Sequence, residues 1–414
     1  VIFEGTTAVL GNEAFSYCGN LQYVVFPEQL DAIPASCFYS CSKLASISLP
    51  STVKSIGGSA FRFCGALISI QLPDGISLDS YAFSNCGSLS EVTFNGRCEA
   101  IGDWCFAHTA VKSVVIPEGV KNLGGASFYE CRQLAEVSFE GGLESIGDVA
   151  FYRCYALGSV TLPDTVVSVG AQAFRECTGL ASVIVPDSVE TMGGGCFYYC
   201  TSLADVKLSD NLTVLGYSDA GFFQSCTSLT EITLPSKLTT LGNAVFRDCS
   251  NLTGITVPDG VTSIPDLAFY NCGALAEVNI SDEVTYIGSS AFAYCPSLTE
   301  AVLPAKLEST GECIFQNSTG ITSVTLPVNM TVVSPKMFYG MSNLTEVIIP
   351  EGVTSIGKDS FNNCCNLTSI IIPKTMKNIG SNAFLNCDHI FEVINYSSLS
   401  MTIGSMSNGH IAFN

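Results

Sequence analysis

The chain has 414 residues and a formal net charge of 17 − 37 = −20, although only 13% of its residues are charged. An acidic surface of this kind repels phosphate backbones and anionic lipids, so no nucleic-acid ligand and no membrane-surface ligand is expected. No stretch of the sequence approaches the ~20 consecutive apolar residues that a membrane-inserted helix needs.

One pattern repeats along almost the whole chain. It is clearest from Leu44 to Cys64, which read L-x-x-I-x-L-P-x-x-V-x-x-I-G-x-x-A-F-x-x-C. Of the sixteen intervals between the recurring phenylalanines, from Phe15 to Phe384, thirteen are 23 residues, two are 22 and one is 26. A unit this short cannot enclose a core alone, so it must bury its apolar side against its neighbours, as in a solenoid.

The first residues, Val1 to Phe3, match the strand part of such a unit. The sequence shows neither an initiator methionine nor a signal peptide at this end. An apolar strand edge left open there would favour aggregation, so we expect that upstream sequence has been removed by processing or by design.

Each unit, here called a rung, predicts three elements in order. The I-x-L part alternates apolar and polar residues as a half-buried strand does, and the proline that often follows marks the strand end because proline lacks an N–H. V-x-x-I-G predicts a second extended piece, with Gly57, Gly147 or Gly357 adopting the backbone angles of a corner. The A-F-x-x-C-x-x-L spacing predicts one or two turns of helix that face inward.

Departures from this register are few. A three-residue insertion, Tyr217-Ser218-Asp219, is predicted to be a surface bulge. After Phe384 the pattern loosens, and Ser407-Asn408-Gly409 is typical of a tight turn. We therefore expect one solenoid domain over residues 1–394 and an irregular terminal rung over residues 395–414.

Cysteine is abundant, and fourteen of the twenty cysteines lie three residues after the repeat phenylalanine. Other rungs carry Thr109, Ser318 or Met341 there, so a small or apolar side chain suffices. We predict free thiols that fill the core, because unpaired cysteine behaves as a small buried hydrophobe. Parallel side chains in a ladder rarely offer disulfide torsions, and no cysteine pair has the nearby histidines of a metal site.

The repeat resembles that of the BspA-like leucine-rich repeat family from Phe3 to about Ile394. The resemblance implies a leucine-rich repeat solenoid of about 17 rungs, with short parallel β-strands and short helical turns, that forms a right-handed curved rod. Family members are typically secreted or displayed on cell surfaces, and several act in adhesion, which implies an extracellular or cell-surface location. The tail from Asn395 to Phe413 also looks like a break segment of bacterial members. The repeat residues are core residues, so no functional site carries over.

The sequence predicts no catalysis, no cofactor and no metal site. Its three histidines are His108, His389 and His410, and the first two are twelve rungs apart, so they cannot share a site. Nothing near His389 and His410 resembles a nucleophile elbow or a set of metal ligands. Both of these histidines are expected to be exposed.

Binding is predicted on the strand face, where two residues of each strand point outward. The first outward position is acidic or hydroxylated in most rungs, and the second becomes apolar in the late rungs. The candidate binding residues are Glu277, Glu300, Val302, Glu346, Ile348, Ile371, Glu392 and Ile394. The alternative is that β-branched residues stand there only because they suit strands.

A second candidate surface lies at the positions that follow each phenylalanine, which are rich in tyrosine and arginine, as at Tyr129, Tyr152, Arg153 and Arg175. These residue types dominate the energetics of interfaces. Stacking between neighbouring rungs explains them equally well, and the single Trp104 is expected to pack locally beside Tyr81.

Two functions remain open at this point. The first is a non-catalytic extracellular adhesion module, expected to be a monomer, that recognises a protein or a glycan through its solenoid surface. The second is a passive spacer or stalk of a larger cell-surface protein.

Overall fold

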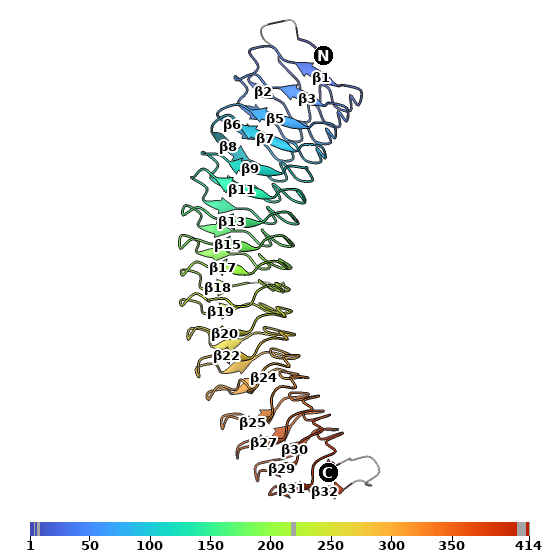
Figure 1. Ribbon diagram of the computed structural model, residues 1–414, viewed down its shortest axis with the longest axis vertical. Helices are drawn as coiled ribbons and strands as arrows, with labels where there is room; N and C mark the ends of the chain where they lie inside the picture. The colour runs from blue at the N-terminus through green and yellow to red at the C-terminus, as the bar shows by residue number, and fades with distance from the viewer. Residues whose placement is uncertain (4, 6–8, 217–220, 404–410, 414) are drawn as a thin grey trace. The chain divides into compact units, whose positions relative to one another are not determined.

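The computed structural model describes residues 1–414 with the exception of residues 4, 6–8, 217–220, 404–410 and 414. The insertion at residues 217–219, the turn predicted at residues 407–409 and His410 therefore lie outside the described residues. The chain divides into two compact units, Val1–Leu212 and Thr213–Asn414. In each unit the strands stack in the order of the chain (Figure 1).

The first unit contains two sets of short parallel strands. The front strands, which correspond to I-x-L, are β1 (Tyr23–Val25), β3 (Ser46–Ser48), β5 (Ser69–Leu72), β7 (Glu91–Phe94), β9 (Ser113–Ile116), β11 (Glu136–Phe139), β13 (Ser159–Thr161), β15 (Ser182–Ile184) and β17 (Asp205–Lys207). The corner strands, which correspond to V-x-x-I-G, are β2 (Ala32–Ile33), β4 (Ser55–Ile56), β6 (Ile76–Leu78), β8 (Cys98–Ile101), β10 (Asn122–Leu123), β12 (Ser145–Ile146), β14 (Ser168–Val169) and β16 (Thr191–Met192). The corner strands form one eight-stranded sheet.

The second unit repeats this arrangement. Its front strands are β20 (Gly254–Thr256), β22 (Glu277–Asn279), β25 (Ser323–Thr325), β27 (Glu346–Ile348), β29 (Ser369–Ile372) and β31 (Glu392–Asn395). Its corner strands are β18 (Val214–Leu215), β19 (Thr240–Leu241), β21 (Ser263–Ile264), β23 (Tyr286–Ile287), β24 (Ser309–Thr310), β26 (Val332–Val333), β28 (Ser355–Ile356) and β30 (Asn378–Ile379). Residues 231–234 and 300–303 carry no strand, so these two rungs lack the predicted front strand. Near the end, β32 (Met401–Ile403) and β33 (Ile411–Phe413) pair antiparallel.

The register of the front strands is that of the sequence repeat. Val160 pairs with Val183, and Val183 pairs with Val206, each one repeat further along. The central residue of each strand faces inward and the residues on either side face outward, as the predicted alternation requires. The bridge between Ile2 and Val25 is also parallel, which confirms that the chain begins in the strand part of a rung.

The predicted helical turns are wrong, because the described residues contain no helix. In the turn segment around most of the phenylalanines, two non-glycine residues have left-handed backbone angles, as Ser36 (φ 53°) and Ser40 (φ 59°) do. The amide of Phe38 donates to the carbonyl of Ala60 in the next rung (2.8 Å), whereas the amide of Tyr39 donates to Ser36 in its own rung (3.1 Å). A helix directs every amide along its own axis. In the turn segment, every second backbone amide donates to the next rung. A helix cannot make this arrangement.

The predicted inward positions of the turn segment are nevertheless buried. The phenylalanine rings form a ladder through each unit, with neighbouring rings stacked at centroid distances of 5.3 Å for Phe61 and Phe83 and 5.6 Å for Phe246 and Phe269. These rings are completely buried. They are the core that a single rung cannot make alone.

The glycine of V-x-x-I-G is required for a reason that the sequence reading missed. Gly57, Gly147 and Gly357 do not have left-handed backbone angles. A Cβ atom at these positions would instead lie 2.5 to 2.6 Å from a backbone nitrogen of the preceding rung. Close contact between rungs, and not an unusual dihedral angle, therefore excludes side chains there.

The cysteines confirm the prediction of free, buried thiols, and they also make a contact that was not predicted. No disulfide joins any of the twenty, and Cys18 alone is exposed. Cys154 and Cys177 donate from Sγ to the carbonyl oxygens of Phe128 and Phe151 in the preceding rungs (3.3 and 3.0 Å). Ser318 makes the same bond (2.6 Å), so the position favours a small residue that can donate a hydrogen bond.

Reagents that modify thiols should react quickly with no more than three cysteines of the folded protein. Cys18 is exposed, and Cys313 and Cys365 are partly exposed, whereas the other seventeen are buried. Burial raises the pKa of Cys131 to about 11, so the reactive thiolate is scarce at neutral pH. Counting labelled thiols by mass spectrometry before and after unfolding tests this expectation. Fast labelling of ten or more thiols in the folded protein would contradict the buried ladder.

Candidate functional site: the strand face

The strand face consists of the outward positions of the front strands. Of the eight predicted binding residues, Glu277 lies on β22, Glu346 and Ile348 lie on β27, and Ile371 lies on β29. Glu392 and Ile394 lie on β31. All of them belong to the second unit. The glutamates on these strands are exposed, because they stand on the opposite side of each strand from the buried central residue.

The structure brings the late isoleucines together. Ile371 and Ile394 are register partners in the pair of β29 with β31. Ile348 occupies the same position one rung earlier, and the amide of Thr368 donates to the carbonyl of Thr345 (3.2 Å) between these two rungs. Ile348 is 50% exposed and Ile371 is 48% exposed. Ile394 is half-buried.

Glu300 and Val302 do not join this group. They lie in the segment that carries no front strand. Glu277 stands one rung earlier still. We therefore define the strand-face patch as Glu346, Ile348, Ile371, Glu392 and Ile394.

Phe391 is an exposed aromatic residue directly before the patch residue Glu392, and it was not predicted from the sequence. It directly precedes β31, its amide donates to the carbonyl of Thr368 (3.0 Å), and it is 81% exposed. The corresponding position in the three preceding rungs is Thr322, Thr345 and Thr368. The change from threonine to a large aromatic residue at this repeat position is the feature of the sequence that could have identified Phe391.

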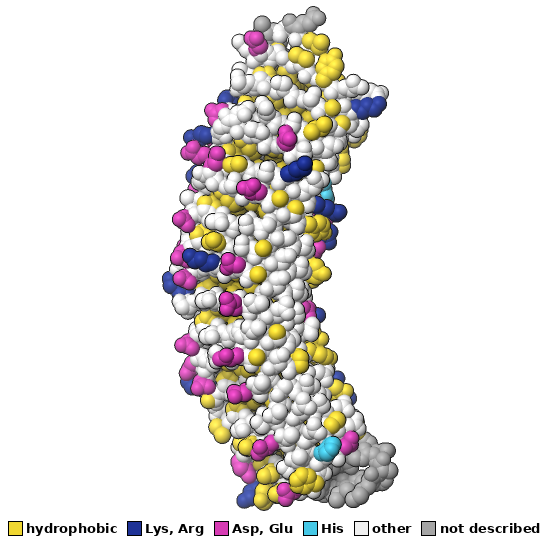
Figure 2. Space-filling view, in the orientation of Figure 1, with side chains coloured by type: hydrophobic (Ala, Val, Ile, Leu, Met, Phe, Trp, Pro, Cys, Tyr) yellow, Lys and Arg dark blue, Asp and Glu magenta, His cyan; other side chains and the backbone are white. Residues whose placement is uncertain are grey.

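Acidic and basic residues are unevenly distributed over the second unit. The two outward columns of its front segments contain Glu231, Glu277, Glu300, Glu346 and Glu392 but no lysine or arginine. Among the described residues, no ion pair involves these five carboxylates. Figure 2 shows acidic side chains over the region of the front strands in each unit. The strand face of the second unit therefore carries a negative potential.

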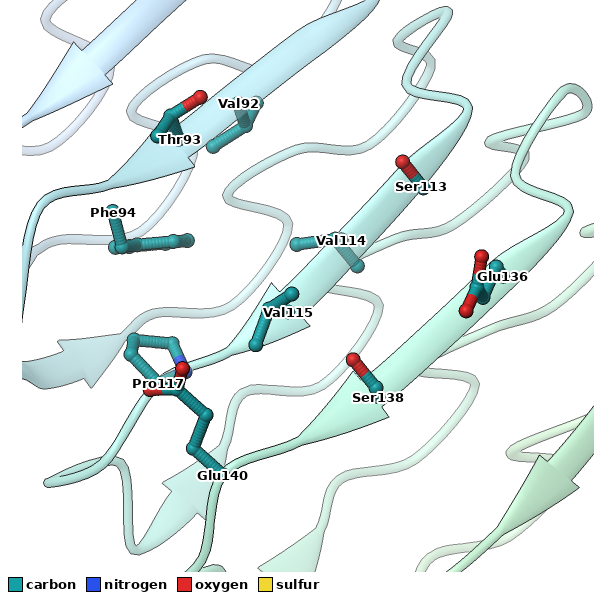
Figure 3. A pocket seen from close by; sticks show the side chains of 10 residues that line it. All are labelled: Val92, Thr93, Phe94, Ser113, Val114, Val115, Pro117, Glu136, Ser138 and Glu140. Carbon is teal, nitrogen blue, oxygen red and sulfur yellow. The ribbon is translucent and has the colours of Figure 1, made fainter.

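The strand face of the first unit contains a hollow of about 310 Å³ between β7, β9 and β11. Figure 3 shows Ser113 and Val115 on β9 and Glu136 and Ser138 on β11. Val115 is 46% exposed, so an apolar side chain stands in this hollow among hydroxyl and carboxylate groups. This hollow was not predicted from the sequence, because the depth of a surface depends on neighbouring rungs.

The tyrosine and arginine positions favour the packing alternative. Tyr129 stacks on Tyr152 with a centroid distance of 4.7 Å, and Trp104 lies 4.9 Å from Tyr129 and stacks on Tyr81 at 6.0 Å. Arg175 lies over the ring of Tyr198 at 4.4 Å. The ring faces are thus covered by neighbouring rungs, as expected for local packing, and are not open to a ligand.

Ion pairs join the same turn segments. Arg153 donates to Glu130 of the preceding rung (3.0 Å) and to Glu176 of the following rung (2.7 Å). Burial of Glu130 by itself raises the pKa of this carboxyl group, but the hydrogen bonds from Arg132 and Arg153 outweigh it, so the pKa lies below its usual value of 4.5. The pKa of Glu176 is lowered in the same way, with Arg153 and Tyr152 as donors. One arginine therefore holds three rungs together.

Replacing Arg153 with glutamine should destabilise the first unit at neutral pH, and the effect should shrink in acid. The folded-state pKa values of Glu130 and Glu176 are depressed, so their contribution is present above about pH 4.5 and is lost as pH falls through the folded-state values. Urea unfolding at pH 7 and at pH 3 measures the difference.

The matched control is Lys121→Gln. This change removes the exposed ion pair of Lys121 with Glu144 (3.1 Å), which should contribute little at either pH. An Arg153→Gln effect that is as large at pH 3 as at pH 7 would show that the charges of Glu130 and Glu176 do not cause it.

The two described histidines lie in different units, His108 in the first and His389 in the second. His108 is 38% exposed and lies 3.6 Å from Glu130, and Nδ1 of His389 is 2.6 Å from the carbonyl oxygen of Cys365. Within the described ranges, no three His, Cys, Asp or Glu residues are placed to hold a metal ion. The described residues also contain no helical segment with the length and hydropathy required to span a bilayer.

Stacked rungs of 23 residues, a phenylalanine ladder and parallel front strands define a leucine-rich repeat solenoid. The sequence matches the family described as BspA type leucine rich repeat region (6 copies) over residues 8–135, 121–219, 217–341 and 311–407. The chain belongs to this family. A search of curated proteins found no significant match.

The solved structures of similar fold include bacterial proteins. A leucine-rich repeat protein from Bacteroides ovatus ATCC 8483 is 25% identical, with a TM-score of 0.59, over 85% of this chain and 88% of that protein. A leucine rich cell surface protein from Faecalibacterium prausnitzii A2-165 is 25% identical over 88% and 81% of the two chains, with a TM-score of 0.36. The pneumococcal vaccine antigen PcpA is 18% identical over 90% and 91%, with a TM-score of 0.47. The likeness to the B. ovatus protein supports the leucine-rich repeat fold.

Proposed function

We propose that this chain is a non-catalytic binding module that acts outside the cell or at its surface and recognises a protein or a glycan through its strand face. The observation that carries the proposal is the strand-face patch, where exposed isoleucines in neighbouring rungs stand beside unpaired carboxylates. Contiguous exposed apolar side chains rimmed by polar groups are typical of interaction sites.

The energetics favour the strand face over the turn side. Fully burying an isoleucine side chain that was exposed is worth roughly 1.5 to 3 kcal/mol, and two neighbouring isoleucines of the patch are each about half exposed. On the turn side, Tyr129, Tyr152 and Arg153 already contact neighbouring rungs. A ligand would gain less there, because those contacts would have to be broken first.

The test is a binding screen of the whole chain against arrays of extracellular-matrix proteins and glycans. A variant with Ile348, Ile371 and Ile394 changed to serine should lose any binding that the wild type shows. The matched control is Ile184→Ser, since Ile184 occupies the same repeat position in the first unit and is 43% exposed. Binding that survives the triple change would exclude the patch as the site.

The second candidate is a passive spacer. It is favoured by the inter-rung bonds, such as those of Arg153, Cys154 and Phe38, which stiffen the stack without presenting a site. A spacer predicts that several rungs can be removed without loss of function, provided that the length is restored with other rungs. Loss of function on replacement of the rungs that carry the patch would exclude the spacer.

A further inference from the structure

We propose that the occupant of the strand-face patch is a basic segment of a polypeptide that carries apolar side chains. This inference rests on the proposed function and specifies the chemistry of the partner. The patch has two properties, and a basic segment with apolar side chains matches both of them.

The first property is an apolar row that continues through three rungs. Ile348, Ile371 and Ile394 occupy one repeat position, and strands in a sheet lie about 4.8 Å apart, so the row extends over roughly 10 Å. Phe391 adds a side chain that is 81% exposed beside β31. Aromatic anchors of this kind contribute strongly when a partner buries them.

The second property is unpaired negative charge on the same face. Glu346 precedes Ile348 by two residues on β27, and Glu392 precedes Ile394 by two residues on β31, so each carboxylate points to the same side as its isoleucine. The cations of these rungs all lie outside both outward columns; they are Lys336, Lys358, Lys374 and Lys377. By contrast, the carboxylates of Glu130 and Glu176, which join neighbouring rungs, both form ion pairs with Arg153.

Charge and chemistry together select the ligand class. Nucleic acids and acidic glycans carry the same sign as the patch and are repelled. A neutral glycan offers hydroxyl groups, which isoleucine side chains cannot bond. Lysine and arginine side chains combine an apolar stem with a cationic head, so a basic segment places stems on the isoleucines and cations on the glutamates.

The test measures binding of the full chain to three synthetic peptides by calorimetry: alternating lysine and leucine, alternating glutamate and leucine, and alternating serine and leucine. The Lys-Leu peptide should bind most tightly. Changing Phe391 to alanine together with Ile371 to serine should raise its Kd about tenfold or more. Changing Glu346 and Glu392 to glutamine should raise the Kd severalfold and reduce its dependence on salt.

The charge control is the pair Glu308→Gln and Glu312→Gln, two exposed acids that flank corner strand β24 and give the same change in net charge. The control should leave the Kd unchanged. The inference would be overturned if the Glu-Leu peptide binds as tightly as the Lys-Leu peptide, or if the Lys-Leu peptide does not bind. It would also be overturned if both pairs of glutamine substitutions change the Kd equally. A different outcome is that the Ser-Leu peptide or a glycan binds, that this binding is lost when the isoleucines are changed, and that it does not respond to the glutamine substitutions. This outcome would overturn the inference and leave the proposed function intact.

Discussion

A Gly147→Ala variant is expected to lose about 3 kcal/mol of folding stability. An added Cβ would lie 2.5 Å from the backbone nitrogen of Gly125 and 2.8 Å from two carbon atoms of the same backbone. Backbone held in a stack cannot move aside as a flexible side chain would, so two rungs have to separate locally. Urea unfolding followed by circular dichroism and by the fluorescence of Trp104 measures the loss.

The control is Gly65→Ala in the same unit. No atom lies within 4 Å of a Cβ built on Gly65, and its backbone angles are ordinary. This variant should be as stable as the wild type or slightly more so, because alanine restricts the unfolded chain. If both variants unfold at the same urea concentration, close contact between rungs is not what requires glycine at the corner.

Truncating Phe151 to alanine should cost about 3 to 5 kcal/mol. The ring is completely buried and lies between Phe128 and Phe174, with centroid distances of 5.5 and 5.3 Å. Its removal leaves a cavity inside a ladder whose neighbours are held by their own rungs and cannot close it. Thermal and urea unfolding of the purified variant give the change directly.

The comparison is Phe391→Ala. Because that ring is 81% exposed, its removal should change stability by no more than about 0.5 kcal/mol. The contrast separates phenylalanines that build the stack from one that is available to a partner. A Phe151→Ala variant with near wild-type stability would mean that the ladder is not the core of the solenoid.

Much of the fold could be predicted from the sequence because every rung repeats the same information. The inward positions are buried as predicted, and proline follows the end of a front strand, as Pro73 follows β5 and Pro373 follows β29. The turn segment was misassigned as helical. Its inward residues have a helix-like spacing, but the periodicity of side chains does not reveal where the backbone amides are directed.

The roles of glycine and cysteine also required the structure. Both were recognised as repeat residues, yet the corner glycine was attributed to dihedral freedom and cysteine to filling space alone. The contacts that require them come from a neighbouring rung. A carbonyl oxygen there accepts a hydrogen bond from the thiol of Cys154, and a backbone nitrogen lies close to Gly147. Contacts across rungs have no local signature in the sequence.

The candidate site was partly predictable for the same reason. The alternation of a strand places Ile348 and Ile371 outward, and the structure agrees. It separates Val302 from them, since that rung lacks a front strand, and it shows that Phe391, whose position precedes the strand, is exposed. The hollow around Val115 depends on three strands together, so no single rung of the sequence encodes it.

The sequence by itself determined that this protein is a stack of 23-residue rungs with parallel strands, a phenylalanine core and free thiols, because a repeat this short can bury its apolar residues only against copies of itself. The tertiary structure alone decided how each rung bonds to the next and which outward side chains stand together. Hydrogen-bond direction, close backbone contact and exposure depend on the distance between rungs, which is a property of the assembled stack and not of any one repeat.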